Sequence, residues 1–385
     1  MRRQQKSSTF PRHTRALEAL KTRGRYRELQ PRAGHDFASN DYLGLAGSDV
    51  LRAAAAEALA RGVPVAAGGS RLLRGNDAEH QLLEQEAAAF FGTEAALFMG
   101  GGFQANLAIF STLPQQGDLV LHDALIHAST HDGMKLGRAE ARSFAHNDAA
   151  AATQAIADWR AGGGTGQVWI AVEGVYSMDG DLAPLTELKA LADRDGAVLV
   201  VDEAHSTGVF GDAGRGLGHR IAQSANVLSL HTCGKALGAS GGLICGAAPL
   251  IDMLINKARA FIYATAPSPL NAALVRAALQ ELSQNPARQL GAWENIAHAH
   301  AEAARLCGIS ELASQILPVV IGADRRAMAV AAALQGQGYD VRGIRPPTVP
   351  RGTSRLRVPI TLNTPREVIT GLFTDLARTL EETPE

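Results

Sequence analysis

The stretch AVLVVDEAH, residues 197–205, is an apolar run that ends in polar residues, an aspartate and a histidine among them. An aliphatic run of this length is typical of a strand buried on both faces, as in a parallel sheet covered by helices. Asp202 falls where the strand ends, and a buried carboxylate is costly unless a cation or a hydrogen-bond donor faces it. The stretch therefore predicts a buried strand that ends in an ion-paired or helix-capping aspartate, or in the counter-ion of a cationic ring nitrogen.

Other β-rich runs lie on both sides of this stretch, and helix-like segments separate them. Strands are expected at 95–99, 118–123, 167–175, 197–205 and 227–231, and helical segments at 124–137, 149–161 and 184–196. This alternation predicts an α/β fold with βαβ units and a mostly parallel sheet. Ligands gather at the carboxyl ends of such strands. The polar residues expected there are His122, His127, Ser177, Asp202, His205 and Lys235.

The order of expected helices and strands changes after the helical stretch that ends near residue 286. From about Ala287 we expect two long helical segments, a strand at 316–322, another helix, an irregular stretch and a final helix. This order predicts a smaller C-terminal α/β domain. The predicted division is an N-terminal segment (1–45), a large domain (46–286) and a small domain (287–385).

The bulk composition excludes several classes of protein. With 46% hydrophobic residues the 385-residue chain is not disordered over most of its length, and a net charge of −1 does not favour a nucleic-acid or membrane partner. No apolar run approaches the ~18–20 residues that span a bilayer, and no signal peptide is recognisable. Cys233, Cys245 and Cys307 lack the spacing of a metal site or a disulfide framework. We therefore expect a cytoplasmic protein without a bound metal.

The N-terminus departs from this balance. Residues 1–15, MRRQQKSSTFPRHTR, contain five Arg or Lys residues, and KTRGRYR follows at 21–27. Two interpretations stay open. The run is either a solvated chain end or a basic patch that meets an anionic substrate.

Lys235 lies in LSLHTCGKALGASGG, residues 228–242, among glycines, small residues and hydroxyls. It follows Asp202 by one expected βα unit, so both side chains should reach the same sheet edge. A lysine short of solvent has its ammonium form disfavoured, which suits Schiff-base chemistry. The simpler interpretation is a tight turn that happens to contain a lysine.

A pyridoxal 5'-phosphate (PLP) site needs such a lysine, an acid for the ring nitrogen, a phosphate cup and a cover for the ring. MGGGFQAN, residues 99–106, follows an expected strand and opens a helix, so its backbone N–H groups can bind phosphate. That cluster includes Gly102 and Phe103, and by itself it could be a plain turn. The Thr232 hydroxyl could serve the same phosphate, and His127 could stack on the ring.

Seven motifs make the chain resemble the α-oxoamine synthases among the fold-type I PLP enzymes. They are ASNDYLGL (38–45), GSRLLRGN (69–76), GGFQAN (101–106), DALIHAS (123–129), EGVYSMDGDLAPL (173–185), VDEAHSTGVFGDAGRG (201–216) and TCGKALGASGG (232–242). The resemblance runs from residue 38 to the C-terminus. It implies a large domain with a mostly parallel central sheet between helices, a smaller C-terminal α/β domain, PLP as cofactor, and a homodimer with sites at the subunit interface.

Two stretches point to one branch of this family. IRPPTVP (344–350) and RSFAHND (142–148) resemble the branch that serves biotin synthesis. That resemblance implies a condensation of L-alanine with a pimeloyl thioester of coenzyme A or acyl carrier protein, with loss of carbon dioxide. Sister enzymes that use glycine are the alternative.

The resemblance also implies roles for individual residues. Lys235 would hold the cofactor and move a proton, Asp202 would face the ring nitrogen, and His127 would cover the ring. His205 and Ser177 would bind the phenolic oxygen, with the phosphate held near Gly102, Phe103 and Thr232 and by Thr265, which would reach a neighbouring subunit's site. The expected substrate-binding residues are Arg23 or Arg25, Asn40, Arg345, Thr348, and Arg357 with Arg355 as its alternative.

Two readings outside the family fit less well. A scaffold protein with an idle site would have lost the cofactor residues, and this chain has all of them. A dinucleotide-binding dehydrogenase would need the G-x-G-x-x-G spacing, which residues 100–103 lack.

Overall fold

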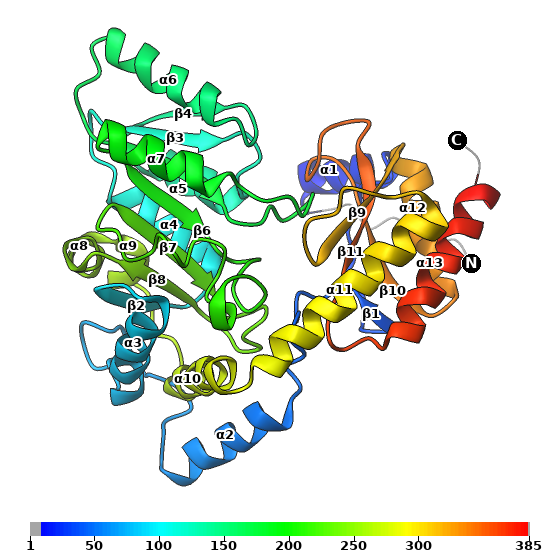
Figure 1. The fold of residues 1–385 in the computed structure, drawn as a ribbon, viewed down its shortest axis with the longest axis horizontal. Coiled ribbons are helices and arrows are strands. Elements are labelled where there is room, and N and C mark those ends of the chain that lie inside the picture. The colour runs from blue at the N-terminus through cyan, green and yellow to red at the C-terminus, as the bar shows by residue number, and fades with distance from the viewer. Residues whose placement is uncertain (1–8, 384–385) are drawn as a thin grey trace.

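The protein has two lobes, each built around one β-sheet (Figure 1). The computed structural model describes residues 9–383. The first eight residues of the basic N-terminal run therefore lie outside the described part of the chain. Within that part, no helix combines the length and the apolar character needed to cross a membrane.

The large lobe contains a seven-stranded sheet of order β2-β8-β7-β6-β5-β3-β4. β8 is antiparallel to both neighbours, and the other pairs are parallel. The strands are β2 (Ala95–Met99), β3 (Leu119–Asp123), β4 (Glu140–Phe144), β5 (Val168–Glu173), β6 (Val198–Asp202), β7 (Val227–Thr232) and β8 (Gly242–Gly246). The five expected strands are confirmed. β4 and β8 were not expected, because β4 is a largely polar edge strand and β8 begins inside a glycine run.

Helices cover both faces of this sheet. They are α3 (Ala78–Phe91), α4 (Gly102–Thr112), α5 (Ala128–Leu136), α6 (Ala149–Ala161), α7 (Leu185–Asp195), α8 (Ala248–Lys257), α9 (Arg259–Ile262) and the short 3-10 turn η1 (Asp212–Gly214). α4, α8 and α9 share one hydrophobic cluster with residues of the sheet, whereas α6 and α7 share another with the opposite face. α2 (Asp49–Ala60) and α10 (Pro269–Gln284) pack together beside the lobe. The sheet is therefore enclosed, as its apolar strands predict.

The small lobe contains a four-stranded sheet of order β1-β10-β11-β9. Its strands are β1 (His35–Phe37), β9 (Ile316–Gly322), β10 (Tyr339–Ile344) and β11 (Ser354–Pro359), and its helices are α1 (Pro11–Thr22), α11 (Pro286–Cys307), α12 (Asp324–Gly336) and α13 (Arg366–Glu382). The two long helical segments expected from Ala287 are in fact one helix, α11, because the following residues 308–315 form no helix. β1 comes from the N-terminal segment, and the three-part division of the chain stays a prediction.

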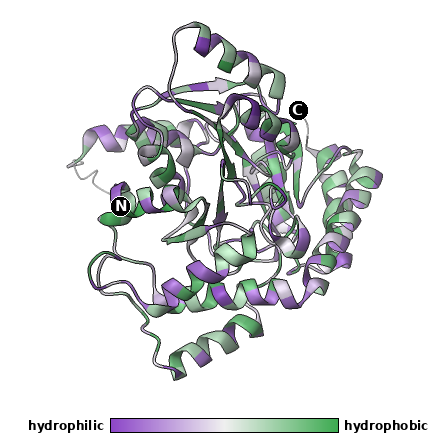
Figure 2. Ribbon diagram, turned by 60° about the vertical axis from the view of Figure 1, so that its left-hand side comes forward, coloured by the Kyte–Doolittle hydropathy of each residue, from purple (hydrophilic) through white to green (hydrophobic). Residues whose placement is uncertain are grey.

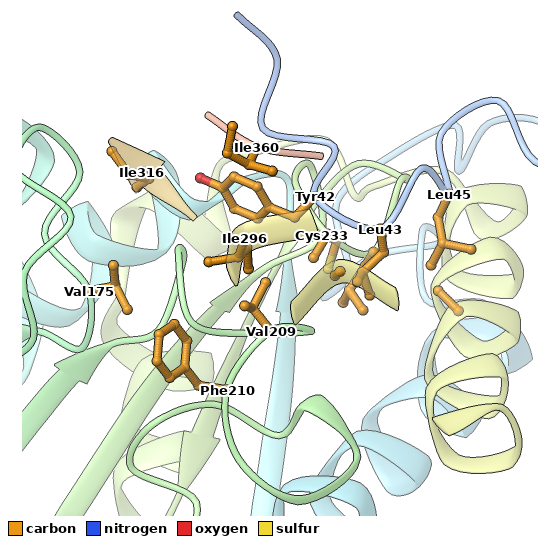
Figure 3. Packing of buried hydrophobic residues seen from close by; sticks show 14 of the residues in the cluster. Tyr42, Leu43, Leu45, Val175, Val209, Phe210, Cys233, Ile296, Ile316 and Ile360 are labelled. Atoms are coloured by element: carbon orange, nitrogen blue, oxygen red, sulfur yellow. The ribbon is translucent and has the colours of Figure 1, made fainter. Parts of the chain in front are cut away.

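One hydrophobic core joins the two lobes. Figure 3 shows a single buried cluster that contains Tyr42 and Leu43 together with Val209 of the large lobe and Ile316 of the small lobe. Along the outer helices, hydrophilic and hydrophobic residues alternate (Figure 2), as expected for helices with one face on a core. The continuous core fixes the small lobe against the carboxyl edge of the large sheet.

Candidate active site

A cavity of about 150 Å³ lies at the carboxyl edge of the large sheet. Its lining comes from the ends of β5, β6 and β7 and from the starts of α4 and α5. The lining residues are Gly102, Phe103, Asn106, His127, Ser129, Glu173, Asp202, Ala204, His205, Leu230, Thr232 and Lys235. Larger hollows exist elsewhere on the surface, but this cavity brings together side chains that can take part in catalysis, such as Lys235, Asp202 and His205. Seven of the predicted cofactor-site residues meet in it.

Lys235 begins a chain of hydrogen bonds that leads away from the cavity. Its Nζ lies 2.6 Å from His205 Nε2, and His205 Nδ1 lies 2.6 Å from the Tyr42 hydroxyl, which donates to Asn40 Oδ1 at 3.0 Å. Because Tyr42 uses its proton toward Asn40, His205 donates from Nδ1 and accepts from Lys235 at Nε2. Asn40, a predicted substrate residue, is therefore linked to the lysine through two side chains.

Burial controls the protonation of this chain. It lowers the pKa of Lys235 to about 8, although the Asp202 and Glu173 carboxylates oppose the shift. It also holds the pKa of His205 well below its ordinary value, with Lys235 adding to the effect. The imidazole is therefore neutral, and the amine is close to losing its proton near neutral pH.

Asp202 ends β6 and is held from two sides. Asn106 Nδ2 donates to one carboxylate oxygen at 2.7 Å, and the backbone N–H of Ala204 donates to the other at 3.0 Å. The same Asn106 amide donates to Ser129 Oγ at 3.0 Å, and Ser129 Oγ lies 2.7 Å from His127 Nδ1. This network holds the carboxylate and His127 in the lining of one cavity, where a flat cationic ring could meet both of them.

The first turn of α4 and the β7–β8 turn press closely together. A Cβ atom on Gly102 would lie 3.3 Å from Thr232 Oγ1, and one on Gly242 would lie 2.9 Å from the Gly101 carbonyl carbon. Gly241 has φ +125°, and a Cβ there would lie 2.3 Å from the Phe98 ring. Only glycine allows this approach. The result is a helix N-terminus with a hydroxyl beside it, which suits a phosphate group.

The cavity thus offers each part that PLP requires. An amine, a held carboxylate, an imidazole wall and a glycine–threonine cradle surround one small space. These residues fit the cofactor.

Glu173 is a lining residue that the sequence analysis missed. It ends β5 directly opposite Asp202 in the sheet register and is 2% exposed. Burial, together with the Asp202 carboxylate, raises its pKa to about 8. One oxygen accepts from the Ser177 backbone N–H at 3.1 Å, while Oε1 has no partner among the described residues. Its position after an apolar strand, like that of Asp202, was the signal that could have found it.

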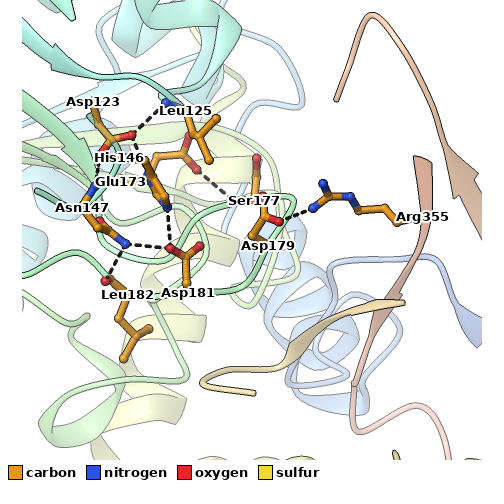
Figure 4. A network of polar contacts seen from close by, with 10 residues as sticks. All are labelled: Asp123, Leu125, His146, Asn147, Glu173, Ser177, Asp179, Asp181, Leu182 and Arg355. Atoms are coloured by element: carbon orange, nitrogen blue, oxygen red, sulfur yellow. Dashed lines mark hydrogen bonds and ion pairs between the residues drawn. The ribbon is translucent and has the colours of Figure 1, made fainter. Parts of the chain in front are cut away.

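The loop 174–183 connects the cavity to the small lobe (Figure 4). Arg357 Nε donates to the Ser177 carbonyl at 2.6 Å, and Arg355 forms an ion pair with Asp179. Both arginines lie on β11, two residues apart, and are largely buried. The guanidinium of Arg357 also interacts with the Tyr42 hydroxyl. Arg357 therefore faces the Lys235 chain, whereas Asp179 already compensates the charge of Arg355.

Several predicted residues lie away from the cavity. Thr265 and Arg23 are exposed, Arg25 pairs with Asp324 at 3.3 Å, and His122 faces His131 edge-on. None of these lines the 150 Å³ cavity. Ser177 does not line it either, but it contacts Glu173, which does.

A second, larger hollow contains the predicted substrate residue Arg345. It measures about 730 Å³ and lies between the N-terminal segment, α12 and β10, with Tyr26, Arg27 and Arg345 in its wall. Arg345 donates to the Tyr26 carbonyl at 3.1 Å, and Arg27 donates to the Thr348 hydroxyl at 3.3 Å. The structure thus places Arg27, which sequence reasoning did not select, beside the predicted substrate residue Thr348.

Known proteins resemble this chain over nearly its whole length. The model of the family described as aminotransferase class I and II matches residues 34–372. An 8-amino-7-oxononanoate synthase from Anaeromyxobacter dehalogenans (strain 2CP-1) is 40% identical, with 96% of this chain and 95% of that protein covered.

Two solved structures extend the likeness to the fold. A serine palmitoyltransferase from S. paucimobilis, with a bound PLP–myriocin aldimine, has a TM-score of 0.85 at 28% identity and covers 97% of this chain and 98% of its own. An 8-amino-7-oxononanoate synthase from Francisella tularensis has a TM-score of 0.75 at 27% identity, covering 91% and 98%.

Proposed function

The chain belongs to the 8-amino-7-oxononanoate synthases, within the class I and II aminotransferase family, and we propose that it joins L-alanine to a pimeloyl thioester with loss of carbon dioxide. It is a PLP-dependent acyltransferase of biotin synthesis. The observation that carries the proposed substrates is the 40% identity to such a synthase over 96% of the chain. When bound, PLP supplies an electron sink for the Cα of the amino acid.

We propose that Lys235 holds the cofactor and afterwards moves the Cα proton. Burial brings its pKa to about 8, so a useful fraction of the amine is unprotonated near neutral pH. His205, which accepts from Lys235 Nζ at 2.6 Å, would orient that amine, and His205 and Ser177 are proposed to bind the phenolic oxygen. His127, which is held by Ser129, would cover the ring.

Asp202 is the proposed partner of the protonated ring nitrogen. Asn106 and the Ala204 N–H keep its carboxylate in one orientation. Gly102, Phe103 and Thr232 would hold the phosphate at the start of α4. Thr265, which is exposed, is proposed to contact the phosphate of a neighbouring subunit in a homodimer.

Arg357 is the better candidate for the L-alanine carboxylate. Arg355 is committed to Asp179 and to the Thr353 carbonyl, so a second carboxylate would have to compete with an existing pair. Arg357 meets only neutral groups at Ser177 and Tyr42, and its fork suits a bidentate carboxylate contact. Asn40, which is linked to Lys235 through Tyr42 and His205, is the proposed second contact of the amino acid.

The acyl donor is proposed to lie along the N-terminal segment and the loop 345–350. Arg27, Thr348 and Arg345 line this path, and they can meet the phosphates of coenzyme A or the acidic surface of a carrier protein. Arg23, the first choice from sequence, is exposed at the end of α1. Arg25 is paired with Asp324, which makes Arg27 the more available cation. A cytoplasmic location stays a prediction.

One assay tests the proposed substrates. The purified, PLP-loaded protein is offered L-alanine, glycine or L-serine in combination with pimeloyl, succinyl, acetyl and palmitoyl thioesters, and the products are identified by mass spectrometry. We expect 8-amino-7-oxononanoate from L-alanine and a pimeloyl thioester as the dominant product. Preferred turnover of glycine would instead support a sister activity. A coenzyme A arm and a carrier-protein arm compare the two donors.

A further inference from the structure

His146 lies between two carboxylates that belong to different parts of the large lobe. Its Nδ1 is 2.8 Å from Asp123 Oδ1 at the end of β3, and its Nε2 is 2.6 Å from Asp181 Oδ2 in the loop 174–183 (Figure 4). Asn147 completes the link, because its backbone N–H donates to Asp123 and its amide donates to Asp181 and to the Leu182 carbonyl. Each ring nitrogen thus faces an acceptor.

This geometry requires a protonated ring. Only an imidazolium donates from both nitrogens, whereas a neutral ring would leave one of its two carboxylate contacts without a proton. Partial burial lowers the pKa of His146, but the hydrogen bonds and charges of Asp123 and Asp181 outweigh it and raise the pKa to about 10. The other titratable neighbour is Tyr176, which lies edge-on with ring centroids 4.5 Å apart. His146 is therefore a fixed positive charge at neutral pH.

Asp181 closes a compact hairpin in the loop. The Tyr176 N–H donates to the Asp181 carbonyl at 3.0 Å, the Gly180 N–H donates to the Tyr176 carbonyl at 2.9 Å, and Val175 bridges to Leu182. An anchor on Asp181 consequently fixes the whole hairpin.

The tip of this hairpin touches the small lobe. Ser177 and Asp179 hold Arg357 and Arg355, as described above. A Cβ on Gly180, which has φ +72°, would lie only 2.1 Å from the Ile316 carbonyl oxygen. The hairpin is thus the part of the large lobe that Arg355 and Arg357 of β11 contact.

We propose that His146 is a positioning residue for the amino-acid carboxylate. Its imidazolium pins the hairpin 174–183 to β3, and the hairpin sets the place of Arg357 relative to Lys235. This proposal rests on the proposed function, because it assigns Arg357 to the L-alanine carboxylate. It predicts that loss of the imidazolium weakens amino-acid binding while the thioester contacts, on another surface, stay intact.

His146→Gln tests the proposal, with Asp181→Asn as a second variant and His298→Gln as the matched control. His298 is a half-buried histidine of α11 that bonds the Arg366 carbonyl and Thr370. For both test variants we expect the L-alanine dissociation constant, from an absorbance titration, and the KM for L-alanine to rise on the order of tenfold, as for one lost charge-assisted hydrogen bond. The thioester KM should stay within about twofold. The double variant should raise the KM for L-alanine no more than either single change, because both substitutions remove the same contact.

Hydrogen exchange supplies a readout that needs no turnover. In the cofactor-free protein, the amides of 174–183 should exchange faster in His146→Gln and Asp181→Asn than in the wild type or in His298→Gln. Unchanged exchange and unchanged L-alanine affinity would overturn the proposal. An equal loss of affinity for L-alanine and for the thioester, together with a lowered unfolding temperature, would also overturn the proposal. If the wild type ignores L-alanine, the proposed function fails, and the exchange data alone decide whether His146 pins the hairpin.

Discussion

The two sheets contribute charges of different kinds to the site. At the edge of the large sheet, Lys235 and Glu173 both have a pKa near 8, because burial disfavours their charged forms. The small sheet contributes Arg355 and Arg357, whose guanidinium groups stay charged at any working pH. Groups that can change protonation suit proton transfer, and fixed charges suit recognition. The interface between the lobes therefore brings proton chemistry and substrate recognition together.

Removal of the amine on the large-sheet side should have the largest effect. Lys235→Ala deletes both the cofactor attachment and the proposed base, and we expect kcat to fall by roughly 10²- to 10⁴-fold, the usual contribution of a positioned acid–base group. Steady-state assays with saturating L-alanine and thioester measure it. Lys135→Ala, at an exposed lysine paired with Asp132, is the control and should keep wild-type kcat. Near-normal kcat in Lys235→Ala would break the assignment of proton chemistry to this sheet.

The small-sheet side should show its effect in affinity. Arg357→Ala should raise the KM for L-alanine by roughly 10- to 100-fold, because hydrogen bonds to charged groups contribute about 1.5–3 kcal/mol. Arg355→Ala should raise it less, since that guanidinium serves Asp179. The KM for L-alanine is measured in parallel on both variants. The reverse ranking would assign the carboxylate to Arg355.

The carboxyl group of Glu173, at the edge of the large sheet, should make the stability of the protein depend on pH. Its pKa in the folded protein is about 8, above the ordinary 4.5, so the folded state holds a proton that the unfolded state releases between these values. The contribution of Glu173 to the free energy of unfolding should therefore fall as pH rises from about 5 to 8. Glu173→Gln should flatten that fall. Urea titrations of the cofactor-free wild type and variant measure the difference, and identical pH slopes would contradict the assigned proton.

Arg27→Ala should have the smallest effect. Arg27 is exposed and bonds only the Thr348 hydroxyl among its described contacts, so its contribution to thioester binding is screened by solvent. We expect a rise of about two- to fivefold in the thioester KM, larger at low ionic strength. L-Alanine affinity is the internal control. An unchanged thioester KM at low salt would remove the N-terminal segment from the donor site.

Local pattern predicted much of the large lobe. The run 197–205 gave the right strand and placed Asp202 at the cavity, because a strand buried on both faces is readable from its aliphatic content alone. β4 was not predicted because an exposed edge strand needs few apolar residues. β8 was not predicted because its first residue, Gly242, belongs to a glycine run. The lack of a side chain at Gly242 lets β8 approach the start of α4.

The site was predicted where a motif placed a polar residue at a strand end. Lys235, His205 and Thr232 are of this kind. Glu173 also ends an apolar strand and was missed, whereas Asn106 depends on a contact with Asp202 that one segment does not reveal. The resemblance to known enzymes supplied the roles. The choice between Arg355 and Arg357 needed Asp179, a partner 176 residues away from Arg355.

The sequence distances within the site have a consequence for how the protein folds. Asn106 meets Asp202 across 96 residues, Tyr42 meets His205 across 163, and Ser177 meets Arg357 across 180. Closing such long loops is slow, so contacts of this kind lower the folding rate. A chain that has collapsed but has not closed these loops lacks the contacts that hold Asp202, His205 and Arg357 at the site. Recovery of PLP binding during refolding is therefore a measure of finished topology rather than of secondary structure.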